Sequence, residues 1–462
     1  MKPTINLRAY QYSAKLGLKK NGLGQLSRRH WPLFLLLGIC IILRFIVFTN
    51  YQPLLFNDSA GYKDLAVQLR TLNFNTYLGM RTPAYPLLIL VGGVNDHVTW
   101  IIQSGLGIMV SILLYLLTMR LTGNKALSFF VGLSYPLSLH VLFFETMILT
   151  ETLATFLLML LLWSLVVAFD KKSIGLYILT GVGISLAALT RPLLLFLIPL
   201  IALFLFFKMK INRETTSEIS RTLGGLLIPA VILVGGWSLF NQFTVDYFGI
   251  TTLLGYNLTN HSGAFMQYAP PEYSVIRDIY LRYRDNNSTQ INVIWQAYLE
   301  MQHATGLSFS ELSRVLTKMS LQMFIEHPGA YFKGVFKGWN DFWKPVFWYA
   351  DYGLIRSVSL RNIVSYLSII EMSLFSHLNS IFLLVALWTI VKAILKPRVF
   401  DFNILFILIV LMASISQALI EYGDGTRFAI PFLPLILFEV ITWLYYLFTN
   451  SLGSWKFERI TP

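Results

Sequence analysis

Long apolar runs constrain this 462-residue chain more than any other feature of its sequence. A helix that crosses a bilayer needs about 20 predominantly apolar residues. Runs that meet or approach this length lie at roughly 32–49, 98–118, 126–144, 152–169, 174–190, 192–207, 223–241, 366–391, 402–420 and 428–448. Only 13% of the residues are charged, about half the fraction typical of soluble domains. The sequence therefore predicts an all-α polytopic membrane protein with a bundle of about ten transmembrane helices, and it excludes an ordinary soluble enzyme.

Basic residues between the apolar runs predict the orientation of the bundle. Residues 1–31 contain seven Lys or Arg and no acid. If this tail lies in the cytoplasm, most Lys and Arg of the short connections lie there too, as the positive-inside bias requires. We therefore expect both termini in the cytoplasm. The basic tail and the single cysteine favour a bacterial inner membrane. The net charge of +13 comes from these clusters, so we expect no nucleic-acid partner.

This topology predicts the regions of the chain. They are a cytoplasmic basic tail (1–31), an N-terminal transmembrane module of about seven helices (32–241) that includes the first outer loop (50–97), an extracytoplasmic loop domain (242–365), C-terminal transmembrane helices (366–448) and a cytoplasmic tail (449–462). The first outer loop is expected to contain an amphipathic helix at 63–72. The long loop is expected to be mostly helical, with helices at 272–284, 290–304 and 310–326. Its Trp-, Phe- and Lys-rich stretch 329–348 suits a membrane interface.

Ionisable residues converge on the predicted outer ends of the helices, where functional groups of membrane proteins are expected. Asp58 follows the first span and Arg81 closes the first outer loop. Glu151 opens the fourth span, Arg191 joins the fifth and sixth, and Arg427 opens the last. Each also has a structural interpretation, because an acid can cap a helix and an arginine can snorkel to the interface. Together they form a candidate site on one face of the membrane.

Other polar residues near these positions are predicted to support the site. Tyr62 and Tyr85 lie in the first outer loop, and Glu421 and Asp424 lie in the glycine-containing turn before the last span.

Four further ionisable residues lie in or beside predicted spans. Glu145 flanks the turn before the fourth span and is a weaker candidate. Arg44, near the outer end of the first span, is another weaker candidate, because it is able to snorkel. Glu371 and Glu439 lie near span edges.

These residues belong to an ordered set of short motifs. The motifs are Asp58 followed by Tyr62, Arg-x-Pro-x-x-Pro at 81–86, Thr-Glu at 150–151, Leu-Thr-Arg-Pro at 189–192 and Arg-Phe-x-x-Pro-x-x-Pro at 427–434. The set resembles the membrane-embedded GT-C glycosyltransferases, in particular the branch of the protein O-mannosyltransferases and the lipid A aminoarabinose transferases. The resemblance extends over the whole chain in order and implies a GT-C-like bundle.

The resemblance also implies an activity. Members of the family transfer a sugar, with inversion, from a polyprenyl phosphate to a hydroxyl of a glycan, lipid or protein at the extracytoplasmic face. Asp58 matches the catalytic base of the first loop. In the protein-mannosyltransferase branch this base is an Asp-Glu pair, whereas Ser59 follows Asp58 here, which speaks against a mannose donor and a protein acceptor.

Roles for the other charged residues follow from the charge of a phosphate leaving group. Guanidinium groups bind phosphate with two hydrogen bonds, so we predict that Arg191 and Arg427 bind the donor phosphate, with Arg81 as an alternate. Glu151 would orient the acceptor or one of these arginines.

No cofactor is predicted. The seven His have no ligand spacing, and the single Cys40 cannot form a cysteine zinc site. A divalent cation shared by Asp58 and Glu151, as in some GT-C relatives, remains an alternative. The chain has no Asp-x-Asp, Gly-x-Gly-x-x-Gly or P-loop motif, which disfavours nucleotide sugars and ATP-driven transport.

Two other functions are compatible with this pattern. An O-antigen ligase or polymerase also uses polyprenyl-linked sugars, but such proteins usually keep their key basic residues in the long late loop. A transporter of polyprenyl-linked glycans would carry charges near the bilayer midplane in broken helices. Here the charges gather at one face, which favours the transferase.

Overall fold

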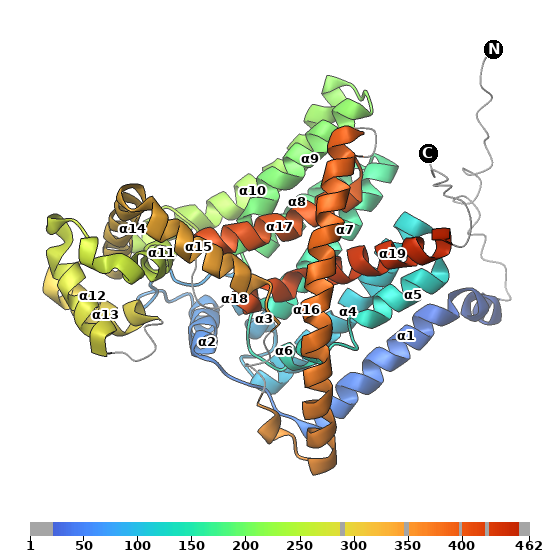
Figure 1. Cartoon of the computed structure of the whole chain (residues 1–462), viewed down its shortest axis with the longest axis horizontal. Helices are drawn as coiled ribbons and strands as arrows, with labels where there is room; N and C mark the ends of the chain where they lie inside the picture. The colour runs from blue at the N-terminus through green and yellow to red at the C-terminus, as the bar shows by residue number, and fades with distance from the viewer. Residues whose placement is uncertain (1–21, 287–291, 346–350, 397–399, 421–424, 452–462) are drawn as a thin grey trace.

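The computed structural model describes residues 22–286, 292–345, 351–396, 400–420 and 425–451, and these residues fold almost entirely into helices (Figure 1). In chain order the helices are α1 (Gly22–Asn50), α2 (Asn57–Thr71), α3 (Ala84–Val91), α4 (Asp96–Thr122), α5 (Lys125–Ser134), α6 (Leu139–Phe144), α7 (Glu151–Lys171), α8 (Ile174–Ala188), η2 (Pro192–Phe196), α9 (Leu197–Ile211), α10 (Thr216–Val245), α11 (Leu254–Ser262), η3 (Gly263–Tyr268), η4 (Pro271–Tyr273), α12 (Ser274–Asn286), α13 (Val293–Thr305), α14 (Phe309–Glu326), α15 (Pro328–Phe342), η5 (Tyr352–Leu354), α16 (Val358–Leu395), α17 (Phe402–Ile420), α18 (Gly425–Ala429), η7 (Ile430–Phe432) and α19 (Leu433–Ser451).

Eight helical segments in the described residues are long and apolar enough to cross a membrane. They are Trp31–Asn50, Asp96–Thr122, Glu151–Lys171, Pro192–Ile211, Thr216–Val245, Val358–Leu395, Phe402–Ile420 and Thr426–Thr449. The shorter apolar helices α5 and α8 occupy the two remaining runs. The prediction of an all-α polytopic membrane protein is confirmed.

The predicted span at 126–144 is wrong as a single helix. α5 has ten residues, a length of about 15 Å, which is half the thickness of the hydrocarbon core. It ends just before Tyr135-Pro136, where the proline has no amide hydrogen to continue the helical ladder. Ser138 then starts α6 by accepting a hydrogen bond from the Val141 amide.

The predicted amphipathic helix at 63–72 also begins earlier than expected. α2 starts at Asn57, so Asp58 lies in its first turn instead of in the preceding loop. The capping group is the Ser59 hydroxyl, which accepts a hydrogen bond from the Phe56 amide at 2.9 Å.

The described hydrophobic residues form one large core in the bundle and a second core among α11–α14, which we call the satellite unit (Leu254–Glu326). α12, α13 and α14 overlap the three helices predicted in the long loop, whereas α11 was not predicted. Tyr256 of α11 centres the second core, stacking on Phe309 at 4.4 Å and on Trp295 at 5.3 Å between ring centroids. In Figure 1 the satellite unit lies at one end of the molecule, next to α15.

Two residues that lead into the satellite unit bind the loop before α3. The Thr252 amide donates to the Gly79 carbonyl at 3.0 Å, and its hydroxyl donates to the Leu78 carbonyl at 2.9 Å. The Thr251 hydroxyl donates to the Met80 carbonyl at 2.9 Å. Gly79 has a φ of +74°, and a Cβ there would lie 2.6 Å from Thr252, so this close approach requires glycine. The loop 78–80 is therefore held by the segment that leads into the satellite unit.

Candidate active site

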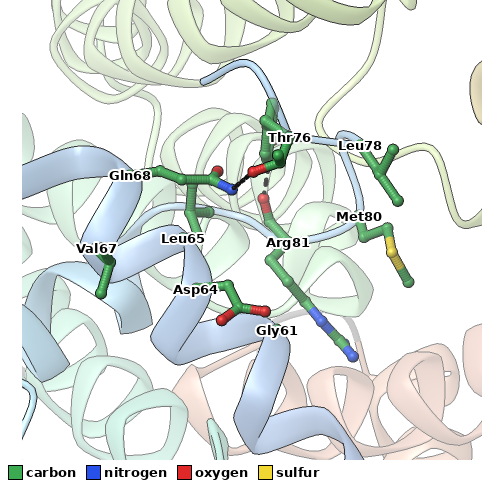
Figure 2. A pocket seen from close by; sticks show the side chains of 10 residues that line it. Gly61, Asp64, Leu65, Val67, Gln68, Thr76, Leu78, Met80 and Arg81 are labelled. Atoms are coloured by element: carbon green, nitrogen blue, oxygen red, sulfur yellow. Dashed lines mark hydrogen bonds between the residues drawn. The ribbon is translucent and has the colours of Figure 1, made fainter. Parts of the chain in front are cut away.

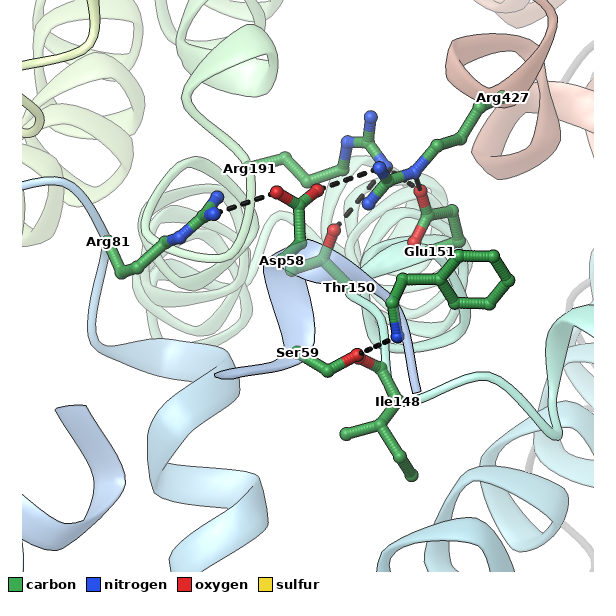
Figure 3. Close-up of polar contacts among 9 residues, drawn as sticks. Asp58, Ser59, Arg81, Ile148, Thr150, Glu151, Arg191 and Arg427 are labelled. Atoms are coloured by element: carbon green, nitrogen blue, oxygen red, sulfur yellow. Dashed lines mark hydrogen bonds and ion pairs between the residues drawn. The ribbon is translucent and has the colours of Figure 1, made fainter. Parts of the chain in front are cut away.

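Five charged side chains from five chain segments form one cluster (Figure 3). Asp58 accepts hydrogen bonds from Arg81 Nη2 at 2.7 Å and from Arg427 Nη1 at 2.8 Å. Glu151 Oε1 accepts from Arg191 Nη1 at 2.6 Å and from Arg427 Nε. Arg427 thus bridges the two carboxylates. The residues predicted for the site from separate motifs are brought together by the fold.

The two carboxylates differ in their access to solvent. The side chain of Asp58 is 33% exposed, whereas that of Glu151 is 1% exposed. Arg191 is buried, with 7% of its side chain exposed, whereas Arg81 and Arg427 are partly buried, with 17% and 11% exposed. Asp58 is therefore the more accessible carboxylate, and the buried Glu151 pairs with Arg191 and Arg427.

Backbone contacts place Asp58 beside Glu151. The Leu54 amide donates to the Thr146 carbonyl and the Ile148 amide donates to the Leu54 carbonyl, both at 2.9 Å. The Ser59 hydroxyl donates to the Ile148 carbonyl, also at 2.9 Å. These bonds join the start of α2 to the segment that leads into α7.

A second pair of contacts places Arg81 near Arg191. The Ala84 amide donates to the Leu189 carbonyl at 3.1 Å, and the Thr82 hydroxyl donates to the Thr190 carbonyl at 3.4 Å. The prolines of the Arg-x-Pro and Arg-Pro motifs follow these arginines and start α3 and η2, because proline is tolerated in a first helical turn. Each arginine therefore projects from just before a helix into the cluster.

Aromatic rings support the guanidinium groups. Arg81 lies 4.7 Å above the centroid of the Tyr62 ring, and Arg191 lies 4.6 Å above that of Phe428. Such contacts attract a cation to the ring face and fix its plane. Sequence reasoning did not single out Phe428, although the Arg-Phe motif contains it.

The predicted supporting tyrosines lie behind the cluster. Tyr62 packs edge-on against Tyr85 with ring centroids 5.1 Å apart. The Tyr85 hydroxyl donates to Gln103 Oε1 at 2.7 Å, and the Gln103 amide donates to the Glu145 and Met147 carbonyls at 2.8 Å each. Neither tyrosine contacts the carboxylates directly in the described contacts. Gln103 fixes the turn before α7, a role that its position within an apolar run did not indicate.

The remaining two supporting candidates, Glu421 and Asp424, lie outside the described residues.

The environment of Asp58 determines its protonation state. Burial alone would raise the pKa of Asp58, but the positive charges of Arg81 and Arg427 and their hydrogen bonds outweigh burial and hold the pKa well below its usual range. Asp58 is therefore a carboxylate at neutral pH. Burial raises the pKa of the neighbouring Tyr62 phenol, which stays neutral.

Arg44, the weaker candidate in the first span, is paired with Glu145 inside the protein and does not join the cluster. Its guanidinium is buried and donates to both carboxylate oxygens of Glu145, from Nη2 at 2.6 Å and from Nε at 2.9 Å. A Cβ on Gly107 of α4 would lie 1.8 Å from Glu145 Oε1, so this glycine makes room for the pair. Glu145 therefore links α1 to the turn before α7 and does not join the cluster of Asp58.

The two acids near span edges also lie apart from the cluster. Glu371 accepts from the Ser138 hydroxyl at 2.6 Å and from the Leu139 amide at 2.9 Å, which fixes the start of α6 against α16. Glu439 is buried in α19.

The described residues contain no group of three or more His, Cys, Asp or Glu that could hold a metal ion. Between the carboxylates of Asp58 and Glu151 lies the guanidinium of Arg427.

A sequence profile gives an independent comparison. Residues 85–237, which are 153 of the 462 residues, match the profile of the dolichyl-phosphate-mannose-protein mannosyltransferase family. The predicted resemblance to the GT-C membrane glycosyltransferases is confirmed. The match supports a GT-C glycosyltransferase as the enzyme class. It contains Glu151 and Arg191 but ends before Arg427 and begins after Asp58 and Arg81. No curated protein matches the chain in sequence.

Solved structures of archaeal oligosaccharyltransferases are similar in outline. The first is AglB from Archaeoglobus fulgidus in complex with an inhibitory peptide and a dolichol-phosphate, with 13% identity, a TM-score of 0.49, and coverage of 93% of this chain and 53% of that chain. The second is the Archaeoglobus fulgidus oligosaccharyltransferase tethered with an acceptor peptide, with 12% identity, a TM-score of 0.48, and coverage of 93% and 52%. The chain thus spans about half the length of these structures.

Proposed function

We propose that this multi-pass membrane protein is an inverting glycosyltransferase that moves a sugar from a polyprenyl-phosphate donor to a hydroxyl acceptor. The observation that carries the proposal is the partly exposed carboxylate of Asp58, which lies in one cluster with three arginines. A base and a phosphate site must lie next to each other for this reaction, and the cluster supplies both.

The charge of the cluster suits a donor with one phosphate. Three arginines and two carboxylates leave one net positive charge, which a singly charged sugar–phosphate–lipid diester would neutralise. Arg191 and Arg427 would bind its oxygens, because a guanidinium presents paired N–H groups to phosphate. They would also stabilise the second negative charge that the phosphate gains as it leaves.

The chemical step is a displacement at the anomeric carbon. The acceptor oxygen forms a bond to that carbon while its proton passes to Asp58. The bond between the anomeric carbon and the phosphate oxygen breaks, and its electron pair leaves with the polyprenyl phosphate. Attack opposite the leaving group inverts the configuration. General-base assistance of this kind contributes roughly 10²–10⁴-fold to the rate.

Donor binding would also prepare the base. In the structure, Arg427 and Arg81 neutralise Asp58 and keep its pKa low, which makes it a weak base. An incoming phosphate competes for the same guanidinium groups. As Arg427 turns toward the phosphate, Asp58 loses part of its positive surroundings and its pKa rises. The base would thus gain strength only when a donor is present.

The direction of α7 supports an extracytoplasmic site. This helix begins at Glu151 in the cluster and ends at Lys171, so the cluster and Lys171 lie at opposite ends of a membrane-spanning segment. Lys172 and Arg120 also lie at the far end, the latter paired with Asp170 at 2.7 Å. If this basic end is cytoplasmic, the cluster faces the outside.

The test is donor turnover in nanodiscs. Purified protein is supplied with a panel of polyprenyl-phosphate sugars and an extract of membrane glycans, and release of polyprenyl phosphate is followed by mass spectrometry. We expect Asp58→Asn to fold normally and to lose at least about 100-fold of the turnover, because the amide cannot take the proton. Asp278→Asn, which changes an exposed acid on α12, is the matched control. Asp58→Asn with more than half of wild-type turnover would rule out the base assignment.

A further inference from the structure

A cavity of about 370 Å³ is lined by Arg81, which also contacts Asp58, and by residues of α2 that include Gly61 and Asp64 (Figure 2). It lies between α2 and the loop before α3. Its volume is at the lower end of the range for small-molecule sites. The mechanism described above needs a place for the acceptor and does not yet assign one.

The cavity and Asp58 share one face of α2. Asp58, Gly61, Leu65 and Gln68 follow one another at intervals of three, four and three residues, which aligns them along a helix. With a rise of 1.5 Å per residue, Gly61 lies about 4.5 Å along the helix from Asp58 and Gln68 about 15 Å. A molecule in the cavity would therefore lie next to the carboxylate at one end and extend one or two rings away from it.

Gly61 keeps the route between the cavity and Asp58 open. A Cβ at this position would lie 3.0 Å from Arg81 Nε, so a larger residue would push the guanidinium out of its place. Arg81 lines the cavity and also donates to Asp58, which makes it the common wall of the two sites.

The lining offers neutral polar groups, a carboxylate and apolar surface. The Gln68 amide donates to the Thr76 hydroxyl at 3.0 Å, and its Oε1 has no donor among the described residues. The Asp64 carboxylate is exposed at the rim and accepts from no donor in the described contacts. Leu65 and Val67 supply the apolar part of the wall. This combination suits a ligand that has several hydroxyl groups for the polar side chains and an apolar ring face for Leu65 and Val67.

The two sides of Asp58 differ in charge: Arg191 and Arg427 lie in the cluster, whereas the cavity carries Asp64 beside Arg81. The cluster with Arg191 and Arg427 attracts the donor phosphate, whereas Asp64 at the cavity rim repels a phosphate. The donor and the acceptor would then approach Asp58 from different sides. This is the arrangement that in-line displacement requires, because the attacking oxygen and the leaving phosphate lie on opposite sides of the anomeric carbon.

We propose that this cavity is the acceptor site and that it binds an uncharged sugar unit of a glycan, with Asp64 and Gln68 accepting hydrogen bonds from its hydroxyl groups. This inference rests on the proposed function. A peptide acceptor is less well matched, because peptides are usually recognised along a strand edge or an extended groove. The cavity is instead a compact, partly open pocket with a few polar side chains, Asp64, Gln68 and Arg81 among them, which matches a single sugar unit better than an extended chain.

The first test measures binding without turnover. Methyl glycosides and their disaccharides are added to the full-length protein in nanodiscs, and binding is detected by saturation-transfer NMR. We expect binding to the wild type and at least a tenfold weakening in Val67→Trp, whose indole would fill the cavity. Val275→Trp on α12 also places an indole at an exposed valine and serves as the matched control. Equal binding to wild type and Val67→Trp, or binding of a serine-containing peptide but of no sugar, would overturn the proposal.

The second test separates the acceptor from the donor. Gln68→Ala is expected to raise the acceptor KM about 2- to 10-fold and Asp64→Ala about 10- to 100-fold, because hydrogen bonds to charged groups are the stronger ones. The affinity for the donor should change less than twofold. Asp64 is exposed, so its removal leaves folding intact, which thermal unfolding would verify. Unchanged acceptor KM in both variants would refute the site.

The two proposals can fail separately. Sugar binding that Val67→Trp blocks, without any release of polyprenyl phosphate, would leave the cavity as a sugar site and reject the transferase. Release that requires Asp58, with an acceptor KM unaffected by Val67→Trp, would leave the transferase and reject the cavity as its acceptor site.

Discussion

Arg427 donates to both Asp58 and Glu151, and this bridge controls the acid–base behaviour of the cluster. Glu151 is the more deeply buried carboxylate, and it accepts hydrogen bonds from Arg191 and Arg427. Asp58 shares Arg427 and also holds Arg81 at the surface. Arg427 is thus the partner of Asp58 for which a bound phosphate would compete, whereas Glu151 would keep Arg191 in place.

The low pKa of Asp58 predicts an unusual pH profile. A base is active when unprotonated, so activity is lost as the pH falls through its pKa in the free enzyme. That pKa is held below the usual carboxyl value of about 4, so kcat/KM should show no acid limb from Asp58 at pH 5–8. Arg81→Ala removes one positive charge, raises the pKa of Asp58 and should move the acid limb to higher pH. The measurement is kcat/KM against pH for both proteins. A wild-type acid limb near pH 6–7 would contradict the assignment.

The sequence predicted which residues belong to the site where a charged residue lies at the edge of an apolar run, because burying a charge there is costly. Asp58, Glu151 and Arg191 are such cases, and all three lie in the cluster. The contacts between them were not predictable, because they depend on backbone bonds such as that from Leu54 to Thr146. Arg44 illustrates the same limit: its sequence position is compatible with snorkelling, and only the fold shows Glu145 within reach.

At the scale of elements, α4 depends on a small residue facing the ion pair of Arg44 and Glu145. Gly107→Ala would place a methyl group 1.8 Å from Glu145 Oε1 and force the carboxylate away from Arg44. We expect a loss of about 1–3 kcal/mol from overpacking, and up to about 3–5 kcal/mol if the pair breaks. The measurement is thermal or denaturant unfolding in a fixed detergent.

Gly105→Ala provides the matched control for this prediction. Gly105 lies on the same helix, two residues away, and a Cβ there would meet nothing within 4 Å. We expect it to be neutral or stabilising by up to about 1 kcal/mol, because alanine favours helix more than glycine does. Equal stability of the two variants would show that the ion pair tolerates displacement.

The existence of the long helices was predictable from the length of the apolar runs, whereas the residues at which helices begin and end were less predictable. The eight long apolar segments overlap predicted runs because hydropathy marks their central parts, but Thr216–Val245 and Val358–Leu395 extend beyond the runs at both ends. The run at 126–144 is just as apolar, yet Pro136 and Ser138 divide it into α5 and α6. α2 starts at Asn57 because Ser59 caps it, a signal that lies in one side chain and not in a periodic pattern.

At the scale of the whole molecule, the orientation in the membrane follows from the two ends of α7. We predict that Asp278 of the satellite unit lies outside the cell and that Lys172 lies in the cytoplasm. Replacing the buried Cys40 by alanine gives a background without cysteine, in which Asp278→Cys or Lys172→Cys adds one exposed thiol. A membrane-impermeant maleimide should label Asp278→Cys in intact cells, and Lys172→Cys only after permeabilisation. The reverse pattern would invert the topology and place the cluster in the cytoplasm.

The overall architecture was predictable in kind because a membrane allows few folds for a chain of this composition. The packing of the satellite unit was not. Its core depends on the stacking of Tyr256 between Phe309 and Trp295, and α11, which carries Tyr256, is too short and too polar to stand out in the sequence.

The bonds from Thr251 and Thr252 to the loop 78–80 have a consequence for how such proteins diversify. Two walls of the cavity belong to different parts of the molecule, since α2 is attached to the bundle and the loop is hydrogen-bonded to the segment that leads into the satellite unit. An inherited change in that segment can therefore reshape one wall while Arg191, Arg427 and Glu151 keep their contacts. If the proposed function holds, a lineage built on this plan would change its acceptor by altering one peripheral part and would retain its donor chemistry.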